Sequence, residues 1–255
     1  MSRPFRPDGI SLDSLGLAPD VRNTLERLRE DISRAAGTNL AGLILYGSLA
    51  RGRYRPDTSD VNVVVLLGDA TTESLEAIAP ALRAAWRSHR VEPFILKLSE
   101  VQSMADVFPT KLLDIQAHHV VLMGEDPFAG LEFKREHLRL RTEQELRNIS
   151  LRMRRRFVSA FDDTASLAAS LTNVAISLKV ELGALLRLAG KDEPAENTSA
   201  AVLEAAAVAF DLDRDALSRV AAMRRGGGLV DDLPGLYNRV LASITRAAEI
   251  ADRME

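Results

Sequence analysis

The chain has 255 residues, with 33 basic and 36 acidic side chains and a formal net charge of −3, so its composition does not indicate a polyanion-binding surface of the nucleic-acid type. It contains no cysteine, which excludes disulfides, thiolate metal sites and a cysteine nucleophile. The N-terminal residues lack the apolar core of a signal peptide, and no apolar run reads as long enough to span a bilayer, so we expect a cytoplasmic protein without a membrane partner.

The first predicted elements are a helix, a strand and a short helix. Apolar residues at helical spacing predict a helix over 19–36, which Gly37 is placed to end. The apolar residues of this stripe are Val21, Leu25, Leu28 and Ile32. Residues 40–46 follow as a buried strand, and 48–51 begin a short helix.

A second strand, a helix and a third strand come next. Residues 61–67 are so continuously apolar and β-branched that they predict a central strand covered on both faces. Residues 72–89 are helical in pattern. Residues 91–97 predict a third strand, in which Pro93 lacks a backbone N–H and favours an edge position or a bulge.

The middle of the chain is mixed and contains the predicted domain boundary. A short helix is expected around 111–115 and a strand over 119–123, followed by a polar turn. We expect a small mixed α/β domain over residues 1–130 and an all-α bundle over 131–255, which is an α+β fold.

The second half has helical spacing throughout. The first long helix is expected to present one apolar face, formed by Leu138, Leu146, Ile149, Met153, Phe157 and Phe161. The second repeats the pattern with Leu171, Val174, Leu178, Leu182 and Leu185. Three further helices are predicted over 199–210, 214–223 and 236–253.

The main functional pattern lies between the first two strands. A glycine turn at Gly47-Ser48, with a helix opening just beyond it, suits the close approach of phosphate to backbone N–H groups. Three arginines in the next loop, Arg51, Arg53 and Arg55, carry forked donors suited to phosphate oxygens. Asp60 and Asn62, two residues apart at the second strand, point to one face and offer hard oxygen ligands for Mg²⁺.

This pattern resembles the DNA polymerase β-like nucleotidyltransferase superfamily, in which a Gly-Ser turn is followed about a dozen residues later by Asp-x-Asp or Asp-x-Glu. The helical second half makes the layout similar to the aminoglycoside and minimal nucleotidyltransferases. The resemblance implies that Gly47 and Ser48 contact triphosphate and that Asp60 binds metal. The chain further resembles an uncharacterised bacterial subgroup, and this second resemblance implies no particular function.

The chain departs from the family pattern at Asn62. An amide there offers one neutral oxygen where the family has a second carboxylate, so the metal site loses a full negative charge. The resemblance implies a third carboxylate on the next strand, and Glu92 is the candidate for this ligand or base. Two carboxylates and an amide would hold one Mg²⁺ brought in with ATP and would be marginal for two.

Two classes of function follow. The first is an enzyme that binds Mg²⁺ with ATP or another nucleotide in a cleft between its domains and transfers a nucleotidyl group to an unknown small-molecule or protein acceptor. The second is a degenerate transferase that has become a ligand-binding or protein-interaction module, including an antitoxin-like partner. The sequence predicts neither the acceptor, nor the base preference, nor the oligomeric state.

Several features have a structural interpretation beside the functional one. Asp60 with Thr58 and Ser59 could be a simple turn cluster, and Glu92 could be a surface residue. Lys179 could reach the surface or a phosphate of the nucleotide. Trp86 is expected in the core. Finally, the run Arg152, Arg154, Arg155 and Arg156 is expected to be a solvated helix face in ion pairs rather than a nucleic-acid or acceptor-phosphate site.

Overall fold

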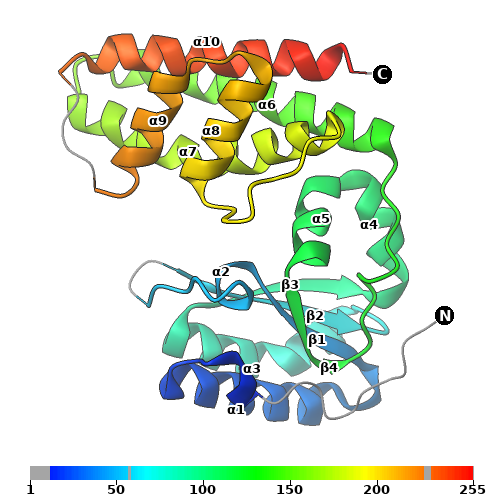
Figure 1. Cartoon of the computed structure of the whole chain (residues 1–255). Helices are drawn as coiled ribbons and strands as arrows, with labels where there is room; N and C mark the ends of the chain where they lie inside the picture. The colour runs from blue at the N-terminus through cyan, green and yellow to red at the C-terminus, as the bar shows by residue number, and fades with distance from the viewer. Residues whose placement is uncertain (1–11, 57–58, 227–230, 255) are drawn as a thin grey trace. The chain divides into compact units, whose positions relative to one another are not determined.

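The computed structural model describes residues 12–56, 59–226 and 231–254, and the chain divides into two compact units, Met1–Glu132 and Phe133–Glu255. We call them the α/β unit and the helical unit. The α+β fold is confirmed, because a mixed four-stranded sheet with flanking helices is followed by an all-helical region (Figure 1). Thr58 of the possible turn cluster and the N-terminal residues 1–11 lie outside the described residues.

The sheet of the α/β unit has the strand order β3-β2-β1-β4. Its strands are β1 (Leu40–Tyr46), β2 (Val61–Leu67), β3 (Val91–Lys97) and β4 (His119–Gly124). β2 pairs in parallel with β3, whereas β1 is antiparallel to both β2 and β4. All four strands were predicted, with β2 in the centre as expected. β3 is at the edge, where a strand tolerates Pro93.

The helices of the α/β unit lie on both faces of the sheet. α1 (Pro19–Ala36) and α3 (Thr72–His89) lie on one side, and α4 (Val101–Val107) and α5 (Pro109–Ala117) lie on the other (Figure 1). The remaining short helices are η1 (Leu12–Leu15), η2 (Gly37–Asn39), α2 (Gly47–Ala50) and η3 (Leu98–Glu100).

The apolar stripe predicted for α1 is buried against alternate residues of the strands, including Leu45, Val61, Val63 and Val91. Because successive strand side chains point to opposite faces, Tyr46, Asn62 and Glu92 project from the other face, away from α1 and α3. The apolar pattern that builds this core therefore also fixes the direction of the candidate site residues.

Trp86 is not a core residue, contrary to the prediction. Its side chain is 44% exposed, whereas Ala85 beside it is buried together with Ile78 and Leu82. The buried stripe of α3 thus advances by three residues at its last step rather than by four. With 3.6 residues per turn both spacings occur, and the pattern alone does not decide between them.

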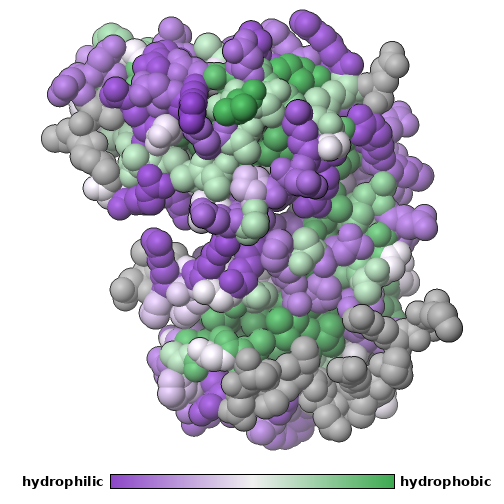
Figure 2. Space-filling view, in the orientation of Figure 1, coloured by the Kyte–Doolittle hydropathy of each residue, from purple (hydrophilic) through white to green (hydrophobic). Residues whose placement is uncertain are grey.

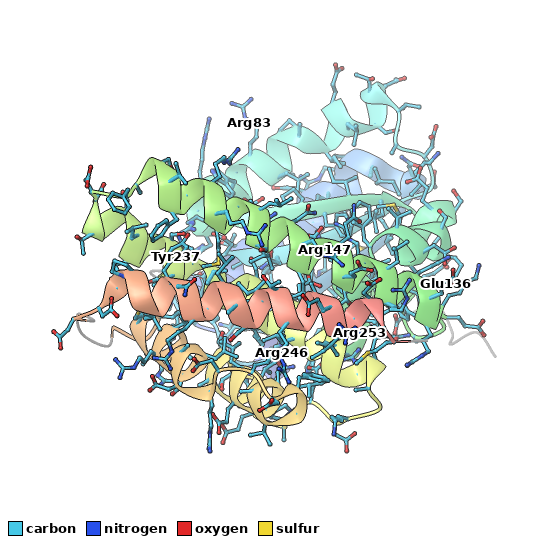
Figure 3. The ribbon with its side chains drawn as sticks, turned by 90° about the horizontal axis from the view of Figure 1, so that it is seen from above. Arg83, Glu136, Arg147, Tyr237, Arg246 and Arg253 are labelled. Atoms are coloured by element: carbon cyan, nitrogen blue, oxygen red, sulfur yellow. The ribbon has the colours of Figure 1, made fainter. Side chains whose placement is uncertain are left out.

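The described residues of the helical unit form five α-helices. They are α6 (Arg135–Ser159), α7 (Thr164–Leu188), α8 (Ser199–Phe210), α9 (Arg214–Met223) and α10 (Leu233–Asp252). α10 runs alongside α6 (Figures 1 and 3). α10 begins three residues before its predicted start, because the Asp232 carboxylate accepts a hydrogen bond from the Gly235 N–H at 2.8 Å and caps the helix.

The apolar faces of α6 and α7 are confirmed with one exception. The five residues predicted for α7 are all buried. In α6, however, the helix ends at Ser159, so Phe161 lies in the connection to α7 and is 66% exposed. Its ring still makes an edge contact with Phe157, at 5.9 Å between centroids.

The hydropathy of the surface side chains is consistent with the burial of the apolar helix faces. Hydrophilic side chains predominate on the face shown in Figure 2, with apolar side chains between them. One helix, α7, is long and apolar enough to cross a membrane, which corrects the prediction that no run has the required length. More than half of its most apolar window is buried inside the helical unit, as in the core helix of a bundle.

Candidate active site

The turn after β1 is built on a glycine in the left-handed region. Gly47 has φ of +78°, and α2 begins at this residue. A Cβ atom added at Gly47 would lie 2.9 Å from Nδ2 of Asn62, so the missing side chain lets the Asn62 amide lie against the turn. Glycine is therefore required at position 47 for two reasons, the left-handed backbone conformation and the close approach of the Asn62 side chain.

Replacing Gly47 with alanine is expected to lower the free energy of unfolding of the α/β unit by about 2–3 kcal/mol, because it adds the Asn62 clash to the left-handed strain. Gly52→Ala is the matched control, since Gly52 has φ of +66° but nothing within 4 Å of an added Cβ. It should cost only about 1–2 kcal/mol. Urea unfolding measures both. Equal losses of unfolding free energy in the two variants would show that the clash with Asn62 adds nothing to the cost of Gly47→Ala.

Three of the polar residues form a row across the sheet. Tyr46 at the end of β1 pairs with Asn62 on β2, and Asn62 pairs with Glu92 on β3. The strand register thus brings Glu92 beside Asn62, at the position where the third carboxylate was predicted. Glu92 is exposed, so its carboxylate is accessible to a ligand.

Asp60 lies immediately before β2 and is only partly satisfied. Its Oδ1 atom is 2.5 Å from Nη2 of Arg90, yet it is buried and accepts no hydrogen bond of acceptable geometry. Arg90 caps α3 in the left-handed region, with φ of +49°. The Asn62 amide donates to the Asp60 backbone carbonyl at 3.3 Å, which ties the two residues together. Asp60 is therefore a carboxylate already paired with one cation, Arg90, and a metal ion would have to share or replace that partner.

The predicted arginines differ in their surroundings. Arg51 is paired with Asp114 of α5, and only 13% of its side chain is exposed. Its Nε atom is nevertheless buried without a hydrogen-bond partner. Arg53 and Arg55 are exposed. Arg51 thus holds the turn against α5, whereas the two later arginines can reach a ligand.

Tyr46 lies among carboxylates. Burial, together with the charges of Glu92 and Asp114, raises the pKa of Tyr46 to about 12. Its phenol is therefore protonated near neutral pH and can donate a hydrogen bond. Glu92 of β3 and Asp114 of α5 thus both contribute to the raised pKa of Tyr46, after the larger effect of burial.

The residues at the site fit a single hard cation. Among the described residues no group of three or more His, Cys, Asp or Glu side chains is arranged to hold a metal ion, so the predicted Mg²⁺ site stays a prediction. Asp60, the Asn62 amide oxygen and Glu92 nevertheless provide oxygen ligands of the kind that Mg²⁺ takes. Lys179 lies on α7 in the helical unit, and its contact with a nucleotide stays a prediction.

Sequence reasoning missed Asp114, Arg90 and Tyr46. Asp114 is 63 residues from Arg51 and reaches it through the packing of α5, which no local pattern indicates. Arg90 reaches Asp60 because α3 ends beside the start of β2. Tyr46 had a signal, since it directly precedes the glycine turn.

Comparison with known protein families identifies the fold. Residues 25–147 match the family model described as "Nucleotidyltransferase domain". The chain carries a nucleotidyltransferase domain of the DNA polymerase β-like superfamily. The matched residues include all four strands of the described sheet and reach into α6. No curated protein matches the chain.

Among solved structures, the chain is similar to spectinomycin adenyltransferase AAD(9) from Enterococcus faecialis, crystallised with ATP and spectinomycin. The match has a TM-score of 0.58 at 14% sequence identity and covers 91% of this chain and 99% of the other. At this identity the similarity establishes the fold, including the helical region that follows the nucleotidyltransferase domain.

Proposed function

We propose that this protein binds a nucleoside triphosphate, ATP in the first instance, together with Mg²⁺, and transfers the nucleotidyl group to a hydroxyl group of an acceptor. The observation that carries the proposal is that the Gly47 turn, Asp60, Asn62 and Glu92 lie together at one end of β1, β2 and β3. The presence of ATP and a small-molecule acceptor in the AAD(9) structure supports it.

Each residue has a defined part in the proposed reaction. The backbone at Gly47 and Ser48 binds phosphate oxygens, and Arg53 and Arg55 add positive charge. Asp60, Asn62 and Glu92 would hold Mg²⁺, which neutralises phosphate charge when bound. The acceptor oxygen forms a bond to the α-phosphorus as the α–β phosphoanhydride bond breaks. Pyrophosphate leaves, and Glu92 is the proposed base that receives the acceptor proton.

The direct test is incubation of the purified protein with Mg²⁺, ATP labelled at the α-phosphate, and a panel of hydroxyl-bearing acceptors including aminoglycosides. The proposal predicts pyrophosphate release and a labelled product with at least one acceptor. No pyrophosphate release, together with no binding of ATP by calorimetry, would contradict it. Whether the acceptor binds between the two units stays a prediction.

The Asn62→Asp substitution distinguishes a catalytically active site from a degenerate one. Restoring the missing charge is expected to lower the Mg²⁺ concentration for half-maximal pyrophosphate release about tenfold, which corresponds to about 1.4 kcal/mol. Asn23→Asp on the exposed face of α1 makes the same charge change on the other side of the sheet and should have no effect. If neither wild type nor Asn62→Asp responds to Mg²⁺, the degenerate binding module becomes the better account.

A further inference from the structure

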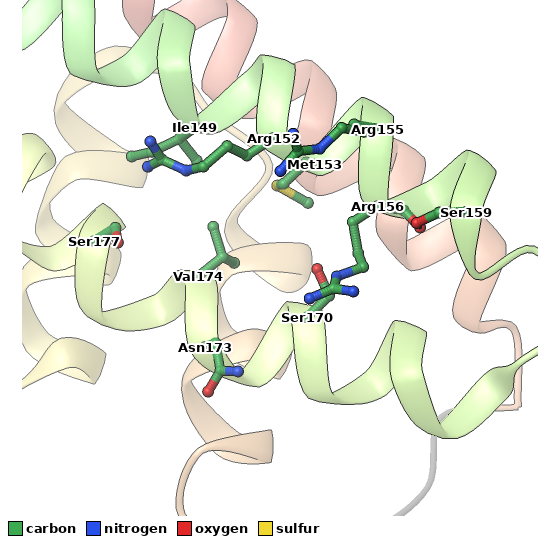
Figure 4. Close-up of a pocket in the computed structure, with 10 residues that line it drawn as sticks. All are labelled: Ile149, Arg152, Met153, Arg155, Arg156, Ser159, Ser170, Asn173, Val174 and Ser177. Atoms are coloured by element: carbon green, nitrogen blue, oxygen red, sulfur yellow. The ribbon is translucent and has the colours of Figure 1, made fainter.

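A cavity of about 320 Å³ lies between α6 and α7, entirely within the helical unit. Three arginines of α6, Arg152, Arg155 and Arg156, line it from one side (Figure 4). Ser170, Asn173 and Ser177 of α7 line it from the other. Ile149, Met153 and Val174 add an apolar part to the lining, and no carboxylate is among the lining residues.

The three arginines are exposed, as expected for a solvated helix face, but the expected ion pairs are not found among the described residues. In the described part of the chain they form neither a salt bridge nor a side-chain hydrogen bond. The N-terminal half of α6 behaves differently, because Arg139 and Arg147 both pair with Glu143 at i,i+4 spacing. The sequence supplies no acid at that spacing after Arg152, and the residues of α7 that line the cavity are Ser170, Asn173, Val174 and Ser177, none of them acidic. Their charge is therefore uncompensated.

The acidic residue that follows Ser177 on α7 does not neutralise the three arginines. Glu181 lies one turn beyond Ser177 on α7, and only 6% of the residue is exposed. Burial, with the charge of Glu145, raises the pKa of Glu181 to about 8, against the opposing charges of Arg141 and Arg152. Glu181 is thus mostly protonated at neutral pH, which leaves the cationic character of the cavity intact.

The helix dipole alone does not explain this arrangement. A cation in the last turns of a helix interacts favourably with the dipole, and this applies equally to Arg154 of the same run. Arg154, however, does not line the cavity. Figure 4 shows Arg156 extending from α6 toward Ser170 on α7. The three lining arginines are thus spread along one side of the cavity, opposite a side of α7 that carries Ser170 and Ser177.

We propose that this cavity binds a multiply charged oxyanion, as free phosphate or as the phosphate group of a larger molecule. Guanidinium groups present forked donors that match phosphate oxygens, and serine and asparagine side chains supply further donors. The volume is at the lower end of the range for small-molecule sites, which suits pyrophosphate or a phosphorylated sugar. The site needs no nucleotidyl transfer, so it stands apart from the proposed activity.

The test is calorimetric titration of inorganic pyrophosphate, without Mg²⁺, into protein that carries Arg53→Gln and Arg55→Gln, which removes the side-chain phosphate contacts of the proposed active site. Adding Arg152→Gln, Arg155→Gln and Arg156→Gln together is expected to weaken binding at least tenfold. Arg154→Gln, which removes a charge from the same helix outside the cavity, should change it less than twofold. If the triple variant has a lowered melting temperature, Arg155→Gln alone should still weaken binding about threefold.

Two further ligands identify the source of the anion. If the affinity for glucose 6-phosphate falls in the triple variant, the site accepts a phosphorylated small molecule. If only the affinity for ATP falls with that for pyrophosphate, it accepts nucleotide phosphates. Absence of pyrophosphate binding by the parent protein, or equal losses in Arg154→Gln and the triple variant, would overturn the proposal.

Discussion

Asp60→Ala is expected to slow nucleotidyl transfer by about 100- to 1000-fold, which corresponds to about 3–4 kcal/mol of transition-state stabilisation. The reason is that Asp60 provides the carboxylate of the Asp60–Asn62 pair, and its Oδ1 atom is buried without a hydrogen bond. Because Asn62 is already neutral, loss of Asp60 leaves Glu92 as the remaining charged ligand. Steady-state pyrophosphate release by both proteins measures the effect.

Arg90→Ala is the control that separates catalysis from structure. It removes the same ion pair, in which both side chains are partly exposed, but leaves the carboxylate in place. If Asp60 acts on the nucleotide, Arg90→Ala should reduce the rate much less than Asp60→Ala does. Equal losses in the two variants would show that the Asp60–Arg90 contact, rather than the carboxylate itself, is what the activity requires.

Glu181→Gln is expected to stabilise the helical unit by about 3 kcal/mol at pH 8 and by much less at pH 5. The folded-state pKa of Glu181 is raised from 4.5 to about 8, chiefly by burial. Its stabilising contribution is therefore complete below pH 4.5 and is lost as the pH rises toward 8, where a buried charge must form. Glutamine has the same shape and never ionises.

Urea unfolding monitored by helical circular dichroism at pH 5, 6, 7 and 8 measures this difference. Glu196→Gln is the matched control, because Glu196 is exposed in the connection between α7 and α8. It should leave the pH dependence of the unfolding free energy unchanged. A difference between Glu181→Gln and wild type that stays constant from pH 5 to 8 would contradict the raised pKa.

Burial patterns explain why so much of the fold was predictable. The stripe of α1 and the apolar runs of β1 and β2 have lengths and spacings that only one kind of element satisfies, and these elements have their predicted bounds. Pro93 placed β3 at an edge because of a missing N–H group. The failures, Trp86 and Phe161, occur at the last turn of a helix and just beyond one, where local spacing leaves burial undecided.

The candidate site was predictable only where its residues are local in sequence. The Gly47 turn, Asp60 and Asn62 fall within one strand–turn–strand segment, so their spacing indicates a common site. Asp114 comes from α5 and depends on tertiary packing. The arginines of α6 were visible in the sequence, but the cavity depends on which residues of α7 face them. Side chains that meet across elements have no spacing to reveal them.

The most direct test of the nucleotide site is a crystal structure of the protein with a non-hydrolysable ATP analogue and Mn²⁺, which anomalous scattering locates. The account predicts the triphosphate against the backbone of Gly47 and Ser48, with a single ion ligated by Asp60 and by Asn62 or Glu92. A triphosphate bound elsewhere on the α/β unit, or an ion with no contact to Asp60, would contradict it.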